Sequence, residues 1–419
     1  MMGDLELIKK LFLEALGASL RGAYVDWKDE LRQEDWADLF LLAQKHQVLP
    51  MIFEAVYASP AARSADPQMM MFFKRQTMHS VMLQAMKTNE FLALMEHLRG
   101  ADLTPCVVKG IVCRSLYPNP DHRISGDEDV LIPPQQYERC HEALLSYGMK
   151  LSDPDKERET AYEVPYGKPG SPVYIELHKH LFPPENDAYG DFNRFFEGIG
   201  ARLEQVCINN TLLYTMKPTD HFFYLICHAF KHFLHSGFGL RQVCDIVLYA
   251  NHYGDQIDWL HVYDMCAKIH AERFTAALLR IGEVYFGFQA QKACYPEIWQ
   301  ALDVDAGPML DDLLSSGIYG DASMSRKHSS TMTLDAVTAD KRGKKQNGNV
   351  LRMLFPSAKL LAPRYPYLAK KPWLLPLAWC TRILRYWKEK RTVSDNRAAE
   401  SLRIGKERIA LMREYRIIK

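Results

Sequence analysis

The sequence predicts an α+β fold, in which a small mixed sheet is embedded between helical N-terminal and helical C-terminal regions. Three observations predict it. Residues 1–100 have helical periodicity, residues 101–186 contain short β-type runs bounded by Gly and Pro, and apolar residues return to helical spacing from about residue 187. With 47% hydrophobic and 25% charged residues, the chain has the composition of a globular protein with an ample core.

Residues 1–100 form the predicted helical N-terminal region. The stretch "MMMFFKRQTMHSVMLQAMKTNEFLALMEHLRG" has no internal Pro or Gly and repeats apolar residues at helical spacing, with Gly100 as a C-cap. We expect its methionine-rich stripe to pack in a core. The opening "MMGDLELIKKLFLEALG" has an acid before its lysines and no small-residue cleavage site, so we expect an amphipathic helix and not a signal peptide.

Residues 101–186 form the predicted α/β core. "LTPCVVKG" is a short β-type run, and "GIVCRSLY" has the length of two helical turns. "DEDVLIP", bounded by Gly126 and Pro133, alternates acidic and apolar residues as a strand does. "PQQYERCHEALLSYG" predicts a helix that ends at Gly148, and "ETAYEVPY" and "SPVYIELHKHLF" predict two further strands.

Three further segments complete the predicted organisation. Residues 187–317 form a helical domain, residues 318–350 a flexible linker or loop because they are polar and rich in Gly, Ser and Lys, and residues 351–419 a basic helical C-terminal segment. No run of 18 apolar residues occurs, so no transmembrane segment is predicted. The nine cysteines form no Cys-x-x-Cys pair, which favours a reducing, cytoplasmic location.

The net charge of +1 hides an asymmetry along the chain. Residues 341–419 contain 21 Lys and Arg against five Asp and Glu, a charge of +16, and residues 1–340 carry −15. The basic segment either folds back on the acidic body or meets an anionic partner. Within it, "KKPWLLPLAWCTRILRYWKEKR" is typical of a buried element, of a membrane surface, or of nucleic-acid binding by stacking on Trp373, Trp379 or Trp387.

The predicted acidic strand suggests a metal site. Because side chains alternate between the faces of a strand, Asp127 and Asp129 share one face, about 7 Å apart, and Glu128 points to the other. A divalent cation between the two aspartates would remove their repulsion, and hard oxygen ligands of this kind suit Mg²⁺. Glu176 in "VYIELH" is the candidate third ligand, since its two apolar neighbours would face the core.

The Lys-Gly pair after the first predicted strand suggests an anion site. Gly110 stands at a strand-to-helix junction, where a phosphate could approach the backbone and the helix N-terminus favours an anion. Lys109 could add a positive charge for a triphosphate, and Arg123 could bind phosphate or brace the acids. Together these residues indicate metal-assisted nucleotidyl transfer, in which an acceptor hydroxyl attacks the α-phosphorus of a triphosphate.

The order of these motifs resembles that of the polymerase-β-type nucleotidyltransferase superfamily, and more closely that of its bacterial uncharacterised nucleotidyltransferase family. The similar elements read "VVKG", "HRISGDEDVLI", "IELH" and "HAFKHFLHSGFGLRQVCDIVL". The likeness covers most of residues 30–260 and continues into "FPSAKLLAPRYPYLAKKPWLLPLAWCTRILRYW". The resemblance implies metal binding by Asp127, Asp129 and Glu176, and nucleotide contact near Lys109, Gly110 and Arg123.

One position departs from the superfamily pattern. Gly110 is followed by Ile111, where the superfamily has Gly or Ser. A hydroxyl contact to the triphosphate is therefore missing, and Lys109 is expected to substitute for it.

The histidines near these motifs leave alternatives open. His178 would either orient a carboxylate or pack in the core. His228 and His232 share a helix face and would pack, line the nucleotide cleft or bind zinc, although Ala229 stands where a His-Glu-x-x-His motif has its Glu.

The sequence therefore predicts a cytoplasmic enzyme. It is a nucleotidyltransferase that uses Mg²⁺ or Mn²⁺ to transfer a nucleoside monophosphate, AMP by default, from a nucleoside triphosphate such as ATP to an unknown hydroxyl acceptor. The acceptor could be a protein, an RNA or a small molecule. Two alternatives from other classes stay open: a catalytically silent nucleotide-binding scaffold, and a peripheral membrane adapter led by the basic C-terminal segment.

Overall fold

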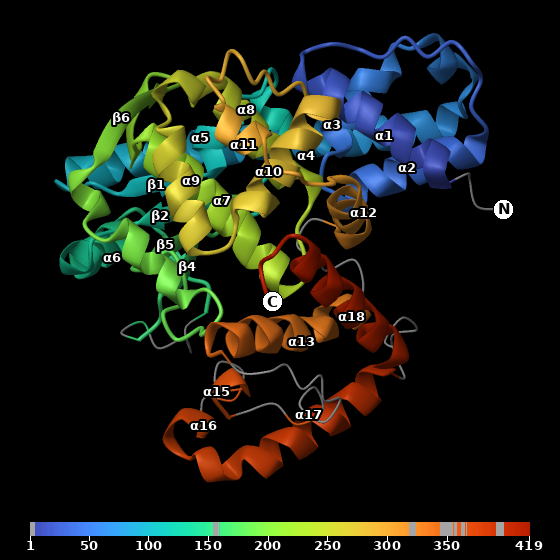
Figure 1. Ribbon diagram of the computed structural model, residues 1–419. Coiled ribbons are helices and arrows are strands. Elements are labelled where there is room, and N and C mark those ends of the chain that lie inside the picture. The colour runs from blue at the N-terminus through green and yellow to red at the C-terminus, as the bar shows by residue number, and fades with distance from the viewer. Residues whose placement is uncertain are drawn as a thin grey trace. The chain divides into compact units, whose positions relative to one another are not determined.

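The computed structural model describes residues 5–153, 158, 160–317, 324–343, 355, 358–361, 365, 367–390 and 398–419. The chain forms two compact units, and Figure 1 shows their elements. The first unit comprises Met1–His228 and Leu240–Ala306, and the second comprises Ala229–Gly239 and Gly307–Lys419. Helix α7 (Pro218–His235) contributes its first part to the first unit and its last turns to the second.

The first unit opens with four helices, as the periodicity predicts. They are α1 (Leu5–Leu20), α2 (Gln33–Lys45), α3 (Leu49–Tyr57) and α4 (Pro67–Gly100), with a 3-10 turn at Pro60–Ser64. Buried rings join α2, α3 and α4, since Phe40 lies 5.8 Å from Phe53 and 4.5 Å from Phe73 between ring centroids. Asp66 begins α4 by accepting a 2.9 Å hydrogen bond from the Gln68 N–H.

The methionine-rich stripe of α4 is largely exposed. Four of its methionines lie in solvent: Met71, Met78, Met82 and Met86. The expected core packing is therefore wrong for these four. Hydropathy misleads here because the buried face of α4 includes Gln84, Lys87 and Thr88, polar side chains that bond to the loop before strand β2 (Glu128–Leu131).

A seven-stranded mixed sheet follows, and the predicted α+β fold class is confirmed. Its strands are β1 (Cys106–Val108), β2 (Glu128–Leu131), β3 (Lys150–Leu151), β4 (Glu163–Gly167), β5 (Tyr174–His178), β6 (Leu203–Ile208) and β7 (Thr211–Met216). They lie in the order β3-β4-β5-β2-β1-β7-β6, which the labelled strands of Figure 1 follow. β1 runs antiparallel to β2 and parallel to β7, and β2 runs parallel to β5.

Two strands come from a segment that was expected to be helical. β6 and β7 lie within residues 187–317 and form an antiparallel hairpin, so the prediction of an entirely helical segment is wrong. Asn209 and Asn210 form its two-residue turn with φ angles of 47° and 65°. Type I′ hairpin turns require positive φ at both positions, and Asn tolerates it. The Asn-Asn pair between two β-type runs is the signal that identifies this hairpin.

The remaining helices of the first unit follow the strands or lie between them in the sequence. They are α5 (Gly110–Arg114), α6 (Tyr137–Ser146), α8 (Leu240–Tyr253), α9 (Trp259–Lys268), α10 (Glu272–Ile281), a π-turn at Gly282–Phe286 and α11 (Glu297–Gln300). Short 3-10 segments lie at Pro120–His122, Pro134–Gln136, Gly190–Phe196, Ile199–Ala201 and Gly254–Gln256. Within the described part of the chain, no helix is long and apolar enough to cross a membrane.

The second unit is built from helices in its described parts. Besides the end of α7, they are α12 (Gly307–Ser316), α13 (Met324–Lys341), α15 (Ala358–Leu361), α16 (Tyr367–Lys370), α17 (Leu375–Lys390) and α18 (Ala398–Glu414). Helix α13 overturns the expectation of a loop for much of residues 318–350. The buried Ser329 and Thr333 donate their hydroxyl hydrogens to carbonyls one turn back in the same helix, so hydroxyl residues typical of loops are satisfied inside a packed helix.

Strand β2 carries a buried acid on the face that meets α5. Glu128 is 0% exposed, and its Oε1 accepts a 2.9 Å bond from Arg114, which is 1% exposed. Its Oε2 accepts a 2.8 Å bond from the Ile111 N–H at the start of α5. Gly110 makes room for this carboxylate, because a Cβ there would lie 2.1 Å from Oε2. Burial raises the pKa of Glu128, but Arg114 and Lys87 outweigh burial and hold it below its usual value.

We expect Glu128→Gln to destabilise the protein, because a neutral amide leaves the buried Arg114 guanidinium without its counter-charge. Removing one partner of a buried ion pair costs about 3–5 kcal/mol. Chemical denaturation followed by circular dichroism measures the loss. Glu142→Gln, the same change at an exposed position of α6, is the matched control and should stay within about 0.5 kcal/mol of wild type. Equal stability of the two variants would contradict a structural role for Glu128.

Candidate functional site

Two carboxylates from adjacent strands meet on one face of the sheet. Asp129 of β2 is the register partner of Glu176 of β5, which confirms that the acidic strand and the later acid lie side by side. The neighbours of Glu176 in β5 are completely buried, so Glu176 points away from the core, as strand alternation requires. Ligand atoms of Asp129, Glu176 and His178 all lie within 4.8 Å of one another. These three residues are called the acidic cluster below.

Both oxygens of Asp129 face positively charged side chains. Oδ1 lies 2.9 Å from Nε2 of His178, and Oδ2 lies 2.8 Å from Nζ of Lys109. The contact with Lys109 lacks hydrogen-bond alignment, so no aligned donor among the described residues reaches this buried oxygen. Burial raises the pKa of Asp129, but Lys109 and His178 outweigh burial and hold the pKa well below its usual range. Asp129 is therefore an ionised carboxylate between two cations.

His178 is the donor that orients Asp129. Burial lowers the pKa of His178, but hydrogen bonds to Asp129 and Glu176 outweigh it and raise the pKa to about 9. The ring is therefore cationic at neutral pH and donates through Nε2. Its Nδ1 lies 3.3 Å from the carbonyl oxygen of His180 and 3.9 Å from Glu163. Of the two roles left open for His178, this geometry favours the orientation of a carboxylate.

Lys109 combines an unusual backbone with a buried charge. Its φ of 48° and ψ of −127° are rare for a residue other than glycine and cost about 1–3 kcal/mol. The Lys109 N–H holds this conformation by donating to Nε2 of His221 at 2.9 Å. The side-chain Nζ lies 2.9 Å from Nε2 of His228. Burial lowers the pKa of Lys109, but the charges of Asp129 and Asp127 outweigh it and raise the pKa well above its usual value.

His228 is placed by its contact with Lys109. An ammonium group has only donors, so Nε2 of His228 accepts the hydrogen bond from Lys109. Among the described residues, the acidic cluster is the group close enough to share a metal ion, and His228 is not part of it. Of the alternatives left open for this histidine, packing beside Lys109 is the one that the geometry favours.

Asp127 stands just before β2, at the lip of the site. It is half-buried and makes no hydrogen bond or ion pair with the described residues. Its charge nevertheless contributes to the raised pKa of Lys109. Asp127 does not belong to the acidic cluster, so the predicted ligand set is brought together in part. Asp129 and Glu176 lie side by side, Asp127 lies at the edge, and His178 lies beside the two paired carboxylates.

Arg123 is buried in a bidentate pair with Asp245 of α8. Its Nε and NH2 groups donate to the two carboxylate oxygens at 3.0 and 2.5 Å, and Tyr117 donates to the same carboxylate at 2.7 Å. Lys87 of α4 donates to the carbonyl of Ser125 at 3.1 Å. The loop before β2 is thereby pinned to two helices. Of the two roles predicted for Arg123, the geometry favours bracing the acids over binding phosphate.

The start of α5 does not present its N–H groups in the expected way. A phosphate was expected at this helix N-terminus, but the Ile111 N–H there donates to Glu128. Nucleotide contact at Gly110 stays a prediction. Sequence reasoning also missed Lys87 and His221, because no local pattern marks a residue whose partner lies far along the chain.

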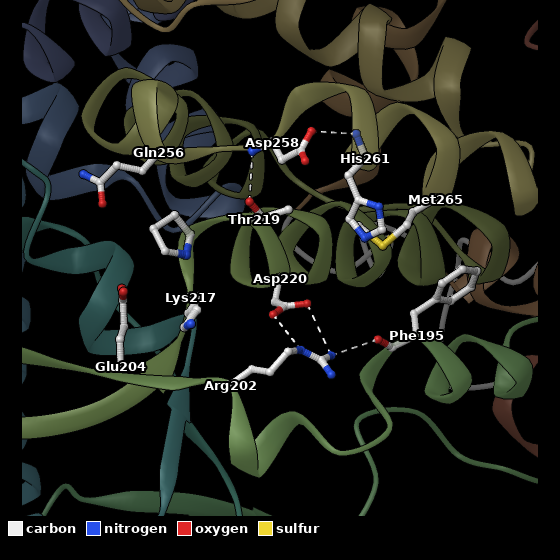
Figure 2. Close-up of a pocket in the computed structure, with 11 residues that line it drawn as sticks. Phe195, Arg202, Glu204, Lys217, Thr219, Asp220, Gln256, Asp258, His261 and Met265 are labelled. Carbon is white, nitrogen blue, oxygen red and sulfur yellow. Dashed lines mark hydrogen bonds and ion pairs between the residues drawn. The ribbon is translucent and has the colours of Figure 1, made fainter.

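A cavity of about 650 Å³ opens elsewhere in the first unit and shares no residue with the acidic cluster. Figure 2 shows charged side chains of both signs around it. Arg202 donates to Asp220 at 3.1 Å. Burial raises the pKa of Glu204, and the nearby Lys217 offsets this in part. Because the positive side chains of this cavity lie beside acidic ones, its lining favours neither an anionic nor a cationic ligand. The acidic cluster is therefore the stronger candidate for phosphate chemistry.

Two carboxylates beside a lysine define a candidate site for a divalent cation and a phosphate-bearing ligand. Residues 32–287 match the family model described as "Uncharacterised nucleotidyltransferase", which is more than half of the 419 residues, and the chain belongs to this family. The matched residues include the whole sheet and the acidic cluster. Comparisons with curated proteins and with solved structures find no match. Family membership supports nucleotidyl transfer as the reaction class.

His221 predicts a pH dependence of stability. Burial lowers its pKa to about 3, and its Nε2 must stay unprotonated to accept from Lys109. Because the pKa is about 6.5 in an unfolded chain, the unfolded state takes up the proton first as the pH falls. This contribution to stability is fully present above about pH 6.5 and is lost toward pH 3, by up to about 1.4 kcal/mol per pH unit. Denaturation of wild type and His221→Gln between these pH values should show a shallower dependence in the variant, and identical slopes would contradict the assignment.

Proposed function

We propose that the chain is an enzyme that transfers a nucleoside monophosphate, AMP by default, from a nucleoside triphosphate to a hydroxyl acceptor. Membership of the family supports the reaction class. The observation that carries the proposal is the pair of carboxylates, Asp129 and Glu176, on adjacent strands beside Lys109. Such a site needs its charges fixed before the substrate arrives, and side chains on paired strands are held more rigidly than side chains on loops.

Asp129 and Glu176, with Asp127 at the lip, are the residues that would hold a divalent cation. Carboxylate oxygens suit Mg²⁺ and Mn²⁺. The buried Oδ2 of Asp129, which no described donor approaches in hydrogen-bond alignment, fits an oxygen that accepts a cation. His178 is better suited to hold Asp129 than to bind metal, because a protonated imidazole has no free lone pair. When bound, the cation would neutralise charge on the triphosphate and polarise its α-phosphorus.

Lys109 and Gly110 are assigned to the triphosphate. Nζ of Lys109 already lies beside Asp129, where phosphate oxygens would approach the carboxylates. Lysine binds phosphate as a point charge, which would replace the hydroxyl contact that Ile111 cannot make. Arg123 is assigned to the loop that carries the acids and not to the nucleotide, because it is buried and paired with Asp245.

The proposed reaction is a single displacement at the α-phosphorus. The acceptor oxygen forms a bond to the α-phosphorus, the bond from this phosphorus to the oxygen that bridges to the β-phosphate breaks, and pyrophosphate leaves. The hydroxyl proton passes to a carboxylate. Glu176 is the candidate because its side chain is 26% exposed, whereas that of Asp129 is 3% exposed. A protein side chain, an RNA end or a small molecule could each supply the hydroxyl.

Asp127→Asn and Asp129→Asn should each lower nucleotidyl transfer by about 10²–10³-fold, because the amide keeps the shape of the side chain and removes its charge. Incubation with each α-labelled triphosphate, with Mg²⁺ or Mn²⁺ and with or without cell extract, measures where the label goes. Circular dichroism confirms folding, and the exposed Glu142→Gln is the matched control that should keep wild-type activity.

Two outcomes would count against this proposal. Full activity of Asp129→Asn would overturn the assignment of the acidic cluster. Binding of a triphosphate without transfer in any of these conditions would favour a catalytically silent scaffold.

A further inference from the structure

Helix α17 presents an apolar stripe to solvent. Leu377 and Leu384 are 56% and 70% exposed, and the exposed Cys380 lies between them at helical spacing. Trp373, in the 3-10 turn Pro372–Leu374 that precedes α17, is 73% exposed and stands four residues before Leu377. These four residues are called the α17 stripe. Exposed apolar side chains that follow one another along a helix face are a feature of interaction surfaces.

The other side of α17 already has its packing partners. Ala378 is completely buried in a cluster with Leu361, Tyr365 and Leu368. Leu375 and Trp379 pack against the same cluster. The α17 stripe is therefore not the face by which this helix packs within its own unit, and its exposure needs another explanation.

Basic residues accompany the α17 stripe. Residues 370–390 contain six Lys and Arg against one Glu, within the segment 341–419 that carries +16. Clusters of four to eight basic residues beside an amphipathic helix attract anionic lipid headgroups. Exposed leucines and tryptophan add apolar area that can be buried at the boundary between headgroups and acyl chains, where tryptophan is enriched.

We propose that α17 docks on an anionic membrane surface, with the α17 stripe at the boundary between headgroups and acyl chains, and that the positive charge of residues 370–390 draws the helix to anionic headgroups. A membrane fits better than a nucleic acid, because Leu377 and Leu384 cannot stack on bases, whereas acyl chains can cover them. The contact lies in the interface plane and does not span the bilayer. It does not depend on the proposed nucleotidyl transfer.

Co-sedimentation of the full chain with vesicles tests this proposal. The chain should bind vesicles of phosphatidylcholine and phosphatidylserine, bind pure phosphatidylcholine weakly, and lose binding as salt screens the charges. Leu377→Glu and Leu384→Glu should each lower the partition constant by about tenfold or more, since each removes a side chain buried in the interface. Leu260→Glu, the same change at a 59% exposed leucine of α9, is the matched control and should bind as wild type does.

Cys380 gives a second readout that does not rely on a variant of the stripe leucines. In a Cys207→Ser, Cys294→Ser background, Cys380 is the remaining exposed cysteine. A small fluorophore on its thiol should be quenched by brominated acyl chains in anionic vesicles and not in neutral ones. An unquenched fluorophore, or equal vesicle binding by wild type and Leu377→Glu, would overturn the proposal. Release of the chain from anionic vesicles by single-stranded RNA at matched charge, or a change of oligomeric state as the sole effect of Leu384→Glu, would overturn it as well.

Discussion

The buried ion pair between Glu128 and Arg114 fixes which way the neighbouring acids, Asp127 and Asp129, point. Glu128 fills the space beside Gly110 and accepts from the Ile111 N–H in the first turn of α5, so β2 has one register in which this acid is buried and paired. Asp129, the next residue, must then face the opposite side, where Lys109, His178 and Glu176 lie. A slip of one residue would exchange the two faces. Three consecutive acids thus divide into one that holds the strand and two that face the site.

The rest of the site is held by polar contacts that cross long stretches of sequence. The loop before β2 is pinned through Arg123 to α8 and through Ser125 to α4, and His221 of α7 supports the backbone of Lys109. Strained backbone persists only where surrounding structure holds it, and such positions gather at functional sites. The strain at Lys109 is sustained by buried groups from several elements, which is the pre-organisation that electrostatic catalysis requires.

Strand alternation made part of this site predictable. It was enough to separate Glu128 from Asp129 and to bring Glu176 to the same face as Asp129, because a period of two depends only on neighbouring residues. The partners of Lys109 and Arg123 were not predictable, since His221 lies 112 residues and Asp245 122 residues away in the sequence. Helix α13 escaped prediction for a different reason: serine and threonine make up much of its buried face, and composition alone assigns them to a loop.

The proposed chemistry requires a cation between Asp129 and Glu176, and manganese anomalous diffraction tests that proposal most directly. Crystals would be grown with Mn²⁺ and a nucleoside triphosphate analogue that cannot be cleaved between its α- and β-phosphates. An anomalous peak in direct contact with both carboxylates is expected, with Nζ of Lys109 beside the phosphate oxygens. A peak remote from both carboxylates, with Lys109 still paired to Asp129, would contradict the metal-dependent transfer proposed for this site.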